Sequence, residues 1–478
     1  MIDLRGSIVI LGGGLSASFA AKEFLESNYK VVMIDAGFNN EDDLTNLHRN
    51  AKEKSPPSYK FKIKENEFVY KNFVSKLNIE TNNFNAIGSL ATGGLSNIWG
   101  GGLSKFDAHE YENEHEHSKI EKIYKEIQME MQGTDCSDNS NKSNQEADLR
   151  LKMLFNSTKK DLSFFPPINA LSKNSSSDKN HNIYNATMLI DKLKKNRNFQ
   201  YISNSIIKKI QKTKDEYILK TENKLNGDGR DYLLKYVFCG LGVISTAKLV
   251  LAMEEVYDSP LSLKTTPMGY FLLFCLSKRQ NKSRFGLSSL SFTINDSSGT
   301  CSGGLFPCNE EILSYYKFLN ILPKFLKTFI DKVFLQRIFL GNIFFSSSMS
   351  ANEISLQENG KCIIQGKNHE ALEKKFSKVK RKINESLKNL NMYVVPGIGK
   401  IARPGSDIHY AGTLPIDDKV TKKLFCNSFG KLNGHKNFHV IDASLLKTLP
   451  GKPHTLHALA QTIIVTREFI SSDAAQSL

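Results

Sequence analysis

The chain of 478 residues is 40% hydrophobic and 24% charged, an ordinary globular composition that argues against a disordered or fibrous protein. The length exceeds what one simple core usually accommodates, so we expect two domains or one large discontinuous fold. Lys and Arg outnumber Asp and Glu by 64 to 49, but the charge is dispersed without a long basic run, which indicates a bias toward anionic ligands and no nucleic-acid partner.

The first predicted elements are a strand, a glycine turn, a helix and a second strand, in "SIVILGGGLSASFAAKEFLESNYKVVMIDAG". Gly12, Gly14 and Ala17 fit the pattern G-x-G-x-x-[G/A]. The first glycine permits the tight turn, and the second lets backbone N–H groups approach a pyrophosphate at the helix N-terminus. Asp35 ends the second strand, where an acid can bond a ribose hydroxyl. This order predicts dinucleotide binding without separating NAD from FAD; a structural turn in another α/β fold is the alternative.

Residues 38–80 are polar and rich in lysine, and a glycine-dense stretch, "GSLATGGLSNIWGGGLSKFD", follows at 88–107. Backbone of this kind can lie directly against a flat ring or a phosphate. Flexible linkers, the alternative, seldom hold Ile-Trp between glycines. We therefore predict a ligand-contacting loop at residues 93–102. Its candidate cofactor contacts are Gly93, Gly94, Ser96, Asn97, Trp99 and Gly100.

The middle of the chain changes character twice. Residues 108–182 begin as a charged helix and carry two polar loops, which indicates an insertion with solvated loops. Residues 183–255 predict a helix, several strands and, in "YVFCGLGVISTAKLVL", a buried strand, a glycine turn and a helix. In residues 256–400, "SRFGLSSLSFTIND" and "KCIIQGKN" indicate sheet. After residue 400 the strand–turn–helix pattern returns.

Residues 315–345 have the pattern of a basic amphipathic helix interrupted by Pro323. Interfacial membrane helices have this pattern. Helices that pack on a sheet in a substrate domain have it too, and they are commoner. Peripheral contact with the inner face of a membrane is the lesser alternative, and it would fit an anionic or lipid-linked substrate. The basic residues that carry the pattern are Lys317, Lys324, Lys327, Lys332 and Arg337.

The cysteines and the N-terminus indicate a cytoplasmic protein. The seven cysteines are odd in number and form no CxxC pair, so we expect free thiols in a reducing compartment and no metal site. Cys301 and Cys308 have the spacing of a pair that faces across a hairpin. The opening "MIDLRGSIVILGGG" lacks the basic region of a signal peptide, and no run of about 20 uncharged apolar residues predicts a membrane span.

Four ordered pieces of the sequence resemble the glucose–methanol–choline (GMC) family of flavoprotein oxidoreductases. They are the glycine turn with Asp35, "GGLSNIWGGG", "YVFCGLGVISTAKLVL", and "IHYAGT" followed by "KNFHVIDASLLKTLPGKPHTLHALA". The second piece is most similar to the GGxSxxW form of the pyranose-oxidase branch. The fourth resembles the family's H-x-x-G-T and its closing strand and helix. The matches cover about half of the chain, and residues 108–180 and 256–400 carry none.

The resemblance implies an α/β fold with an α+β cap. A Rossmann-like FAD-binding domain, discontinuous in sequence, would lie under a sheet-and-helix substrate domain. The glycine loop and the C-terminal helix would meet around one flavin ring. The implied boundaries are 1–107, 183–255 and 401–478 for the FAD-binding domain, 108–182 for the insertion and 256–400 for the substrate domain.

The resemblance also implies FAD-dependent oxidation of an alcohol group, with a sugar or sugar derivative as the expected substrate. His409, the histidine of H-x-x-G-T, would face the flavin and accept the hydroxyl proton while hydride passes to flavin N5. Asp442, in "VIDAS", and Thr455 would lie near the cofactor. For Asp442 the alternative is a helix N-cap. The electron acceptor is left open.

The sequence departs from the family pattern at two positions. Alignment of "HALA" places Gly451 where the family has a second His or Asn. We predict His454 as the second catalytic residue, with His457 as a further candidate; an ordinary polar residue is the alternative for each. Ile98 stands where the pyranose-oxidase form has a flavin-linking histidine, so noncovalent FAD is expected. The competing functions are flavin binding without redox turnover, a lyase or isomerase reaction in the same pocket, and an NAD-dependent dehydrogenase.

Overall fold

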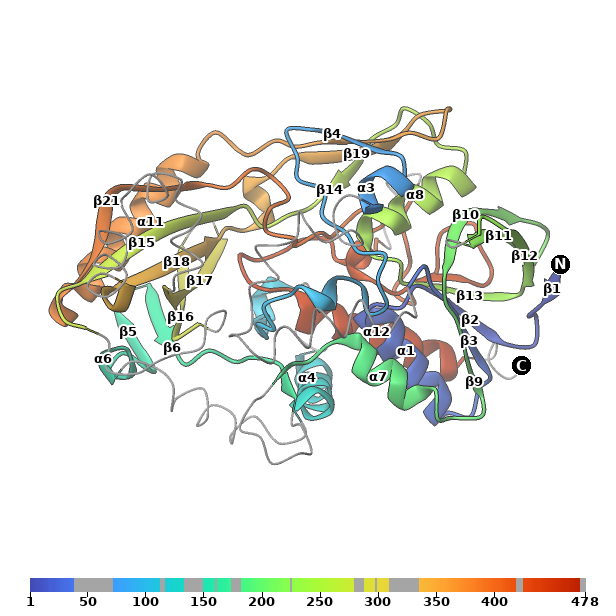
Figure 1. Cartoon of the computed structure of the whole chain (residues 1–478), viewed down its shortest axis with the longest axis horizontal. Helices are drawn as coiled ribbons and strands as arrows, with labels where there is room; N and C mark the ends of the chain where they lie inside the picture. The colour runs from blue at the N-terminus through green and yellow to red at the C-terminus, as the bar shows by residue number, and fades with distance from the viewer. Residues whose placement is uncertain are drawn as a thin grey trace.

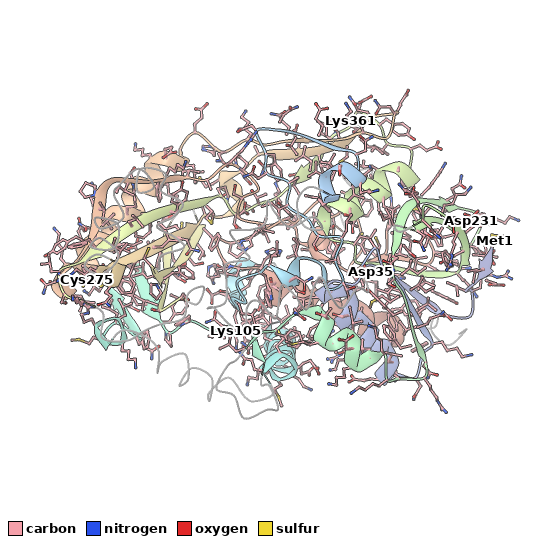
Figure 2. All side chains as sticks on the ribbon, viewed as in Figure 1. Met1, Asp35, Lys105, Asp231, Cys275 and Lys361 are labelled. Atoms are coloured by element: carbon pink, nitrogen blue, oxygen red, sulfur yellow. The ribbon has the colours of Figure 1, made fainter. Side chains whose placement is uncertain are left out.

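A computed structural model gives the fold of the chain. It is elongated, with one half around a parallel sheet and the other around an antiparallel sheet (Figure 1). Side chains mark the two halves, with Asp35 in the first and Cys275 at the far end of the second (Figure 2). The described residues are 1–37, 72–111, 117–132, 149–159, 161–172, 182–223, 226–278, 288–296, 299–308, 335–417 and 424–472.

The first half is built on a five-stranded sheet in the order β22-β13-β2-β3-β9, in which every neighbouring pair is parallel. All residues of β2, β3, β13 and β22 are buried, as expected for apolar strands that are covered on both faces. The predicted strand–helix–strand unit at the N-terminus is therefore confirmed. The strands are β2 Ile8–Leu11, β3 Val31–Ile34, β9 Phe199–Ile202, β13 Tyr236–Cys239 and β22 Phe438–Val440.

Four helices gather beside these strands (Figure 1). Helix α1, Leu15–Glu26, contacts β2, β3, α7 and α12, and α12 also contacts α4. The ring of Phe238 in β13 lies 4.7 Å from that of Phe24 and 5.0 Å from that of Phe469, so edge-on aromatic contacts join the strand to two helices. The helices are α1 Leu15–Glu26, α4 His117–Gln132, α7 Ala186–Leu193 and α12 Thr455–Ile470.

Two smaller sheets share the hydrophobic core of the parallel sheet. One has the order β1-β12-β11-β10 and the other β14-β19-β20-β4. Helix α8, Val243–Met253, packs against β10 and β19 and so joins them. The strands are β1 Ile2–Asp3, β4 Ile79–Asn82, β10 Ser205–Lys212, β11 Tyr217–Asn223, β12 Gly229–Leu234, β14 Leu261–Leu263, β19 Asn352–Leu356 and β20 Cys362–Gln365; helix α3, Asn72–Lys76, precedes β4.

The second half is a seven-stranded antiparallel sheet in the order β21-β15-β18-β17-β16-β6-β5. Helix α11, Leu372–Leu387, contacts β21, and the apolar side chains between helix and sheet form a separate core that includes Phe271, Phe292 and Phe376. The strands are β5 Ser157–Lys159, β6 Leu162–Phe165, β15 Met268–Cys275, β16 Leu290–Asp296, β17 Gly299–Pro307, β18 Ile338–Phe344 and β21 Met392–Ile401.

The segment expected as an insertion, residues 108–182, contributes to both halves. Its helix α4 packs on α12, while β5 and β6 extend the antiparallel sheet. The domain boundaries at residue level stay a prediction. The remaining short elements are α6 Leu149–Lys152, β7 Leu171–Ser172 and β8 Asn182–Ile183.

The helix expected at residues 315–345 is wrong where the structure describes this segment. Residues 335–337 form a 3-10 turn, and Ile338–Phe344 is strand β18, whose burial alternates along the strand. Gly341 explains the choice, because a Cβ there would lie 2.2 Å from the Phe271 ring of the neighbouring strand. The basic residues from Lys317 to Lys332 lie outside the described part, so the predicted membrane contact stays a prediction. No described helix is long and apolar enough to cross a bilayer.

The cysteines of the described segments form no disulfide, as expected from the sequence. Cys301 and Cys308 are both buried in the second half and are not bonded to each other. Cys136 lies outside the described residues.

Candidate active site

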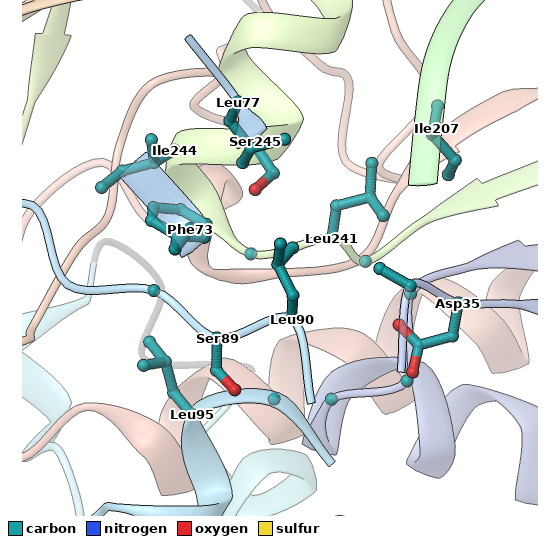
Figure 3. A pocket seen from close by; sticks show the side chains of 18 of the residues that line it. Asp35, Phe73, Leu77, Ser89, Leu90, Leu95, Ile207, Leu241, Ile244 and Ser245 are labelled. Atoms are coloured by element: carbon teal, nitrogen blue, oxygen red, sulfur yellow. The ribbon is translucent and has the colours of Figure 1, made fainter. Parts of the chain in front are cut away.

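A cavity of ≈ 290 Å³ lies at the carboxyl ends of the parallel strands. Its walls come from the turns that follow β2, β3 and β13, together with the start of β10 and residues 87–90 and 94–96. Figure 3 shows Leu90 and Leu95 on one side, α8 on the other and Asp35 at the edge. Ligands of open α/β sheets bind at this edge, where strand ends and helix starts converge.

The glycine turn after β2 forms the floor of the cavity. Gly12 has a φ of 101°, and a Cβ there would lie 2.6 Å from the carbonyl oxygen of Gly240, so only glycine lets the two turns pass this closely. A Cβ on Gly14 would meet nothing within 4 Å, because this residue faces the cavity. Helix α1 starts here without a capping side chain, so its first N–H groups are available to an anion. Ala17 is buried within α1 and does not line the cavity.

Asp35 lies at the cavity edge, directly after β3. The Tyr201 hydroxyl donates to Asp35 Oδ2 at 2.8 Å, and the backbone N–H groups of Gly13, Ala36 and Gly37 also donate to the carboxylate. Burial raises the pKa of Asp35 to about 6, although these hydrogen bonds oppose the rise. The acid is therefore fixed beside the glycine turn, where the sequence placed it.

The glycine-dense stretch is a folded loop around a 3-10 turn at Gly94–Asn97. Gly94 and Ser96 line the cavity. The other polar side chains fasten the loop to the body of the protein. Asn97 donates to the Thr92 carbonyl at 2.7 Å, and Trp99 Nε1 donates to the Tyr184 carbonyl at 2.7 Å. The structure thus places Gly94 and Ser96 at the cavity, whereas Gly93, Asn97, Trp99 and Gly100 lie outside its lining.

His409 and His454 come together although they lie far apart in sequence. Their ring centroids are 5.1 Å apart, with the rings at 77° to each other. The Phe344 ring of β18 lies 4.7 Å from the His409 ring, so the second half of the molecule supplies one wall. Thr266, which sequence reasoning missed, has its Oγ1 2.6 Å from His409 Nδ1. No motif in the sequence points to Thr266, because the fold alone brings it to the histidine.

His454 is buried at the start of α12, and its Nδ1 has no hydrogen-bond partner among the described residues. Burial lowers the pKa of His454 to about 4, so the ring is neutral near pH 7. Buried polar atoms are nearly always paired in proteins, so this nitrogen is available to hydrogen-bond a group that binds beside it.

The glycine loop reaches this histidine pair. A Cβ on Gly102 would lie 3.6 Å from Pro453 Cγ, so the end of the loop meets the segment that precedes α12, as expected. Ile98 is buried with Ile87, and Ile408 packs against both. Tyr410, next to His409, lines the cavity, so this segment connects the cavity to the histidine pair. Ile98 stands at the position of the flavin-linking histidine of the pyranose-oxidase form, and its aliphatic side chain has no atom that could form such a bond.

Gly451 cannot hold the second histidine that the alignment places there. A Cβ on Gly451 would lie 2.4 Å from the Phe344 carbonyl oxygen and 2.5 Å from that of Thr300. His457 points into a packed cluster, with Nδ1 2.7 Å from the Tyr124 hydroxyl and its ring stacked 4.4 Å from that of Phe106. Burial lowers the pKa of His457 to about 3, with a smaller effect from His454. These contacts favour an ordinary packed residue for His457.

Asp442 connects β22 to the start of α8. Its carboxylate accepts from the N–H groups of Gly242 and Ser444, both at 2.9 Å, and from Thr246 Oγ1 at 2.5 Å. Burial raises the pKa of this acid. The contact with Ser444 is the N-cap that the sequence offered as the alternative. Neither Asp442 nor Thr455, the first residue of α12, lines the cavity, and their cofactor contacts stay predictions.

No protein-family model matches the chain, and no curated protein matches it. Among solved structures, pyridoxine 4-oxidase from Mesorbium loti is similar over 98% of this chain and 100% of that chain, with a TM-score of 0.64 and 12% sequence identity. The chain therefore shares the mixed α/β fold of that oxidase over essentially its whole length. At 12% identity this likeness shows the fold alone. It gives no support to the pyranose-oxidase branch, and that resemblance rests only on the sequence motif.

Proposed function

We propose that the protein is an FAD-dependent oxidoreductase that oxidises an alcohol group, with His409 as the base. The observation that carries the proposal is the His409–His454 pair, because the segment around His409 borders, through Tyr410, a cavity with dinucleotide-binding features. The fold shared with a solved oxidase supports the same reaction class. A packed structural histidine pair would not need the orphaned Nδ1 of His454.

The residues around the cavity fit FAD. The uncapped start of α1 beside Gly14 suits a pyrophosphate, and Asp35 suits a ribose hydroxyl. Gly94 and Ser96 offer close backbone approach on the opposite wall. When bound, the flavin would supply the hydride acceptor that no side chain can provide. Ile98 has no atom that could bond covalently to the cofactor, so we propose noncovalent binding.

The two histidines would divide the work on the substrate hydroxyl. A neutral imidazole at His409 can accept the hydroxyl proton, which avoids a high-energy alkoxide. His454 is neutral because of its burial, so it can hydrogen-bond the same oxygen without adding a positive charge. Phe344 beside His409 restricts the approach of substrate to one side of the ring.

The substrate class rests on the motif resemblance. We propose a sugar or sugar derivative, with an anionic or lipid-linked form in view of the net positive charge. We also propose a cytoplasmic location, with peripheral membrane contact as the variant to test. The electron acceptor stays open.

The first test is the cofactor itself. The purified protein should be yellow, and acid or heat should release intact FAD. A colourless protein that takes up no FAD on reconstitution would contradict the proposal. Flavin that remains on the precipitated chain would contradict only the noncovalent binding. Bound flavin that no alcohol reduces would favour a flavin-binding protein without redox turnover. If such a protein still consumes a substrate, a lyase or isomerase reaction would be favoured.

The second test concerns His409. His409→Asn should keep its FAD, while stopped-flow bleaching of the oxidised flavin by substrate slows by ~10²–10⁴-fold, the usual contribution of a positioned base. This equals about 3–5 kcal/mol of transition-state stabilisation. His454→Ala should slow bleaching comparably if it binds the substrate oxygen. The matched control is His369→Asn, because His369 is exposed and its Nδ1 accepts from the nearby Ala371 N–H at 3.1 Å. Unchanged bleaching in His409→Asn would refute the role.

A further inference from the structure

Asp407 is a buried carboxylate that no described cation pairs with by salt bridge. Its Oδ2 accepts from the Thr266 N–H at 2.9 Å and lies 3.3 Å from Thr266 Oγ1. The backbone N–H of His409 donates to the same carboxylate. Asp407 therefore contacts both the histidine segment and the threonine that touches its ring.

The pairing of two chain segments fixes this arrangement. Lys264 and Ala411 form an antiparallel bridge, with N–H to carbonyl distances of 2.9 and 3.0 Å in the two directions. In this antiparallel register Thr266, two residues after Lys264, comes opposite His409, two residues before Ala411. Thr266 is fully buried, so its hydroxyl has no access to water and must find partners among these groups.

The Thr266 hydroxyl has one proton and two neighbours, which gives two arrangements. If it donates to Asp407, it accepts from His409 Nδ1–H, and His409 Nε2 keeps its lone pair. If it donates to His409 Nδ1, then Nε2 carries the proton and cannot act as a base. Burial raises the pKa of Asp407 to about 7, so at pH 8 most of this carboxyl is ionised. An ionised carboxylate can only accept, so at that pH Asp407 selects the first arrangement.

Ile408, between Asp407 and His409, supplies a second and independent observation. Its φ is 61°, in the left-handed region that a β-branched residue rarely adopts. Such a conformation is strained and persists where the surroundings enforce it. Here the bonds to Asp407 and the packing of Ile408 against Ile98 hold it. Strain at this position indicates that the geometry of the two flanking side chains is constrained.

We propose that Asp407, acting through Thr266, is a positioning residue that holds His409 in the tautomer with Nδ1 protonated and the lone pair on Nε2. The catalytic value of that tautomer rests on the proposed function. The tautomer itself is a property of the chain without substrate, so it can be measured separately.

The test is the ¹⁵N spectrum of the full-length protein labelled at histidine, recorded at pH 8 with and without added FAD. The His409 signals are identified by their loss in His409→Asn. We expect a protonated-type Nδ1 and a lone-pair-type Nε2 in the wild type. In Thr266→Val, which keeps the shape and removes the hydroxyl, the Nδ1–H form should fall from the major to the minor species. Thr266→Ser should restore it, and Asp407→Asn should weaken it.

Kinetics supply a second readout that a merely structural role would not move. Flavin bleaching should slow by ~10-fold or more in Thr266→Val and recover in Thr266→Ser, with FAD content unchanged in both. Thr221→Val is the matched control, since Thr221 is a buried threonine that donates to the Arg230 carbonyl at 3.3 Å in a different sheet. It should change neither the His409 signals nor the bleaching rate.

A protonated Nε2 in the wild type, or an unchanged tautomer in Thr266→Val, would overturn the proposal. If Thr266→Val does not fold, the wild-type tautomer and Asp407→Asn decide the question in the same way. A wild-type protein with the expected tautomer but no FAD and no alcohol turnover would refute the proposed function and leave the positioning arrangement intact. Normal alcohol turnover in a protein with Nε2 protonated would refute the positioning arrangement and leave the proposed function intact.

Discussion

The cavity and the histidine pair adjoin each other, but they are built differently. The floor of the cavity is shaped by backbone, through glycine turns at residues 12–14 and 240–242 that follow neighbouring strands. The pair is held by side chains from widely separated segments, among them Thr266 and Phe344. A site made of backbone is encoded in one short motif, whereas a site made of side chains depends on long-range packing. The two should therefore respond differently to substitution.

Gly12→Ala should have the largest effect on stability. The new Cβ would lie 2.6 Å from the Gly240 carbonyl oxygen at a φ of 101°, so neither turn can relax cheaply. We expect the free energy of unfolding in urea to fall by ~3 kcal/mol or more. In Gly14→Ala the Cβ meets open space, so stability should change by less than ~0.5 kcal/mol while FAD affinity falls. Equal effects of the two variants would contradict a cavity shaped by backbone.

Gly451→Ala tests whether close backbone packing beside the histidines also contributes to the stability of the fold. Two carbonyl oxygens lie within 2.5 Å of the Cβ position, so we expect a loss of ~2–3 kcal/mol in the free energy of unfolding. Gly6→Ala is the control, because nothing lies within 4 Å of its Cβ. A stable Gly451→Ala protein would reopen the alignment that places the second catalytic residue there.

The pH dependence of His454→Gln tests the burial of the pair. The folded pKa of about 4 lies below the ordinary 6.5, so neutral His454 stabilises the fold above pH 6.5, and this contribution is lost as the pH falls toward 4. Between pH 7 and pH 5 the wild type should lose about 2 kcal/mol relative to His454→Gln. The difference between variants is the right measurement, because Asp35 and Asp407 have raised pKa values and change stability in the opposite direction. Parallel pH curves would show that His454 is solvated.

Tyr201→Phe should have the smallest effect. It removes the one side-chain donor to Asp35 and leaves the three backbone donors in place. We expect the free energy of unfolding to fall by ~1 kcal/mol in urea titrations and FAD binding to persist. Loss of FAD binding would show that the cavity depends on side chains as much as the histidine pair does.

The sequence predicted best what is local in the chain. The glycine turn, the flanking strands and Asp35 follow one another within a single strand–helix–strand unit, and β-branched strands around a short alanine-rich helix leave few alternatives. The helix predicted at 315–345 is wrong over Ile338–Phe344, because a short apolar run fits both periods. Pairing with β15 and β17, strands from other parts of the sequence, makes this segment β18.

The histidine pair could be predicted only in part. His409 stands in a motif, and His454 was found by its residue type near an expected helix start. Their proximity, and the exclusion of a side chain at Gly451, depend on how β17 and β18 pack against the segment before α12. Thr266 lies between β14 and β15 with no local signal. Asp407 lies only two residues before His409, but its role depends on the bridge at Lys264, which brings Thr266 to both residues.

The place of β22 and α12 in chain order has a consequence for synthesis. While a ribosome is still translating residues before Phe438, the β13 edge that β22 will pair with has no strand beside it, and the face of α1 that α12 will cover is bare. His454 is also missing at that stage, so the histidine pair can form only after the start of α12 has emerged. Nascent and prematurely terminated chains should therefore depend on chaperones more than the released protein does.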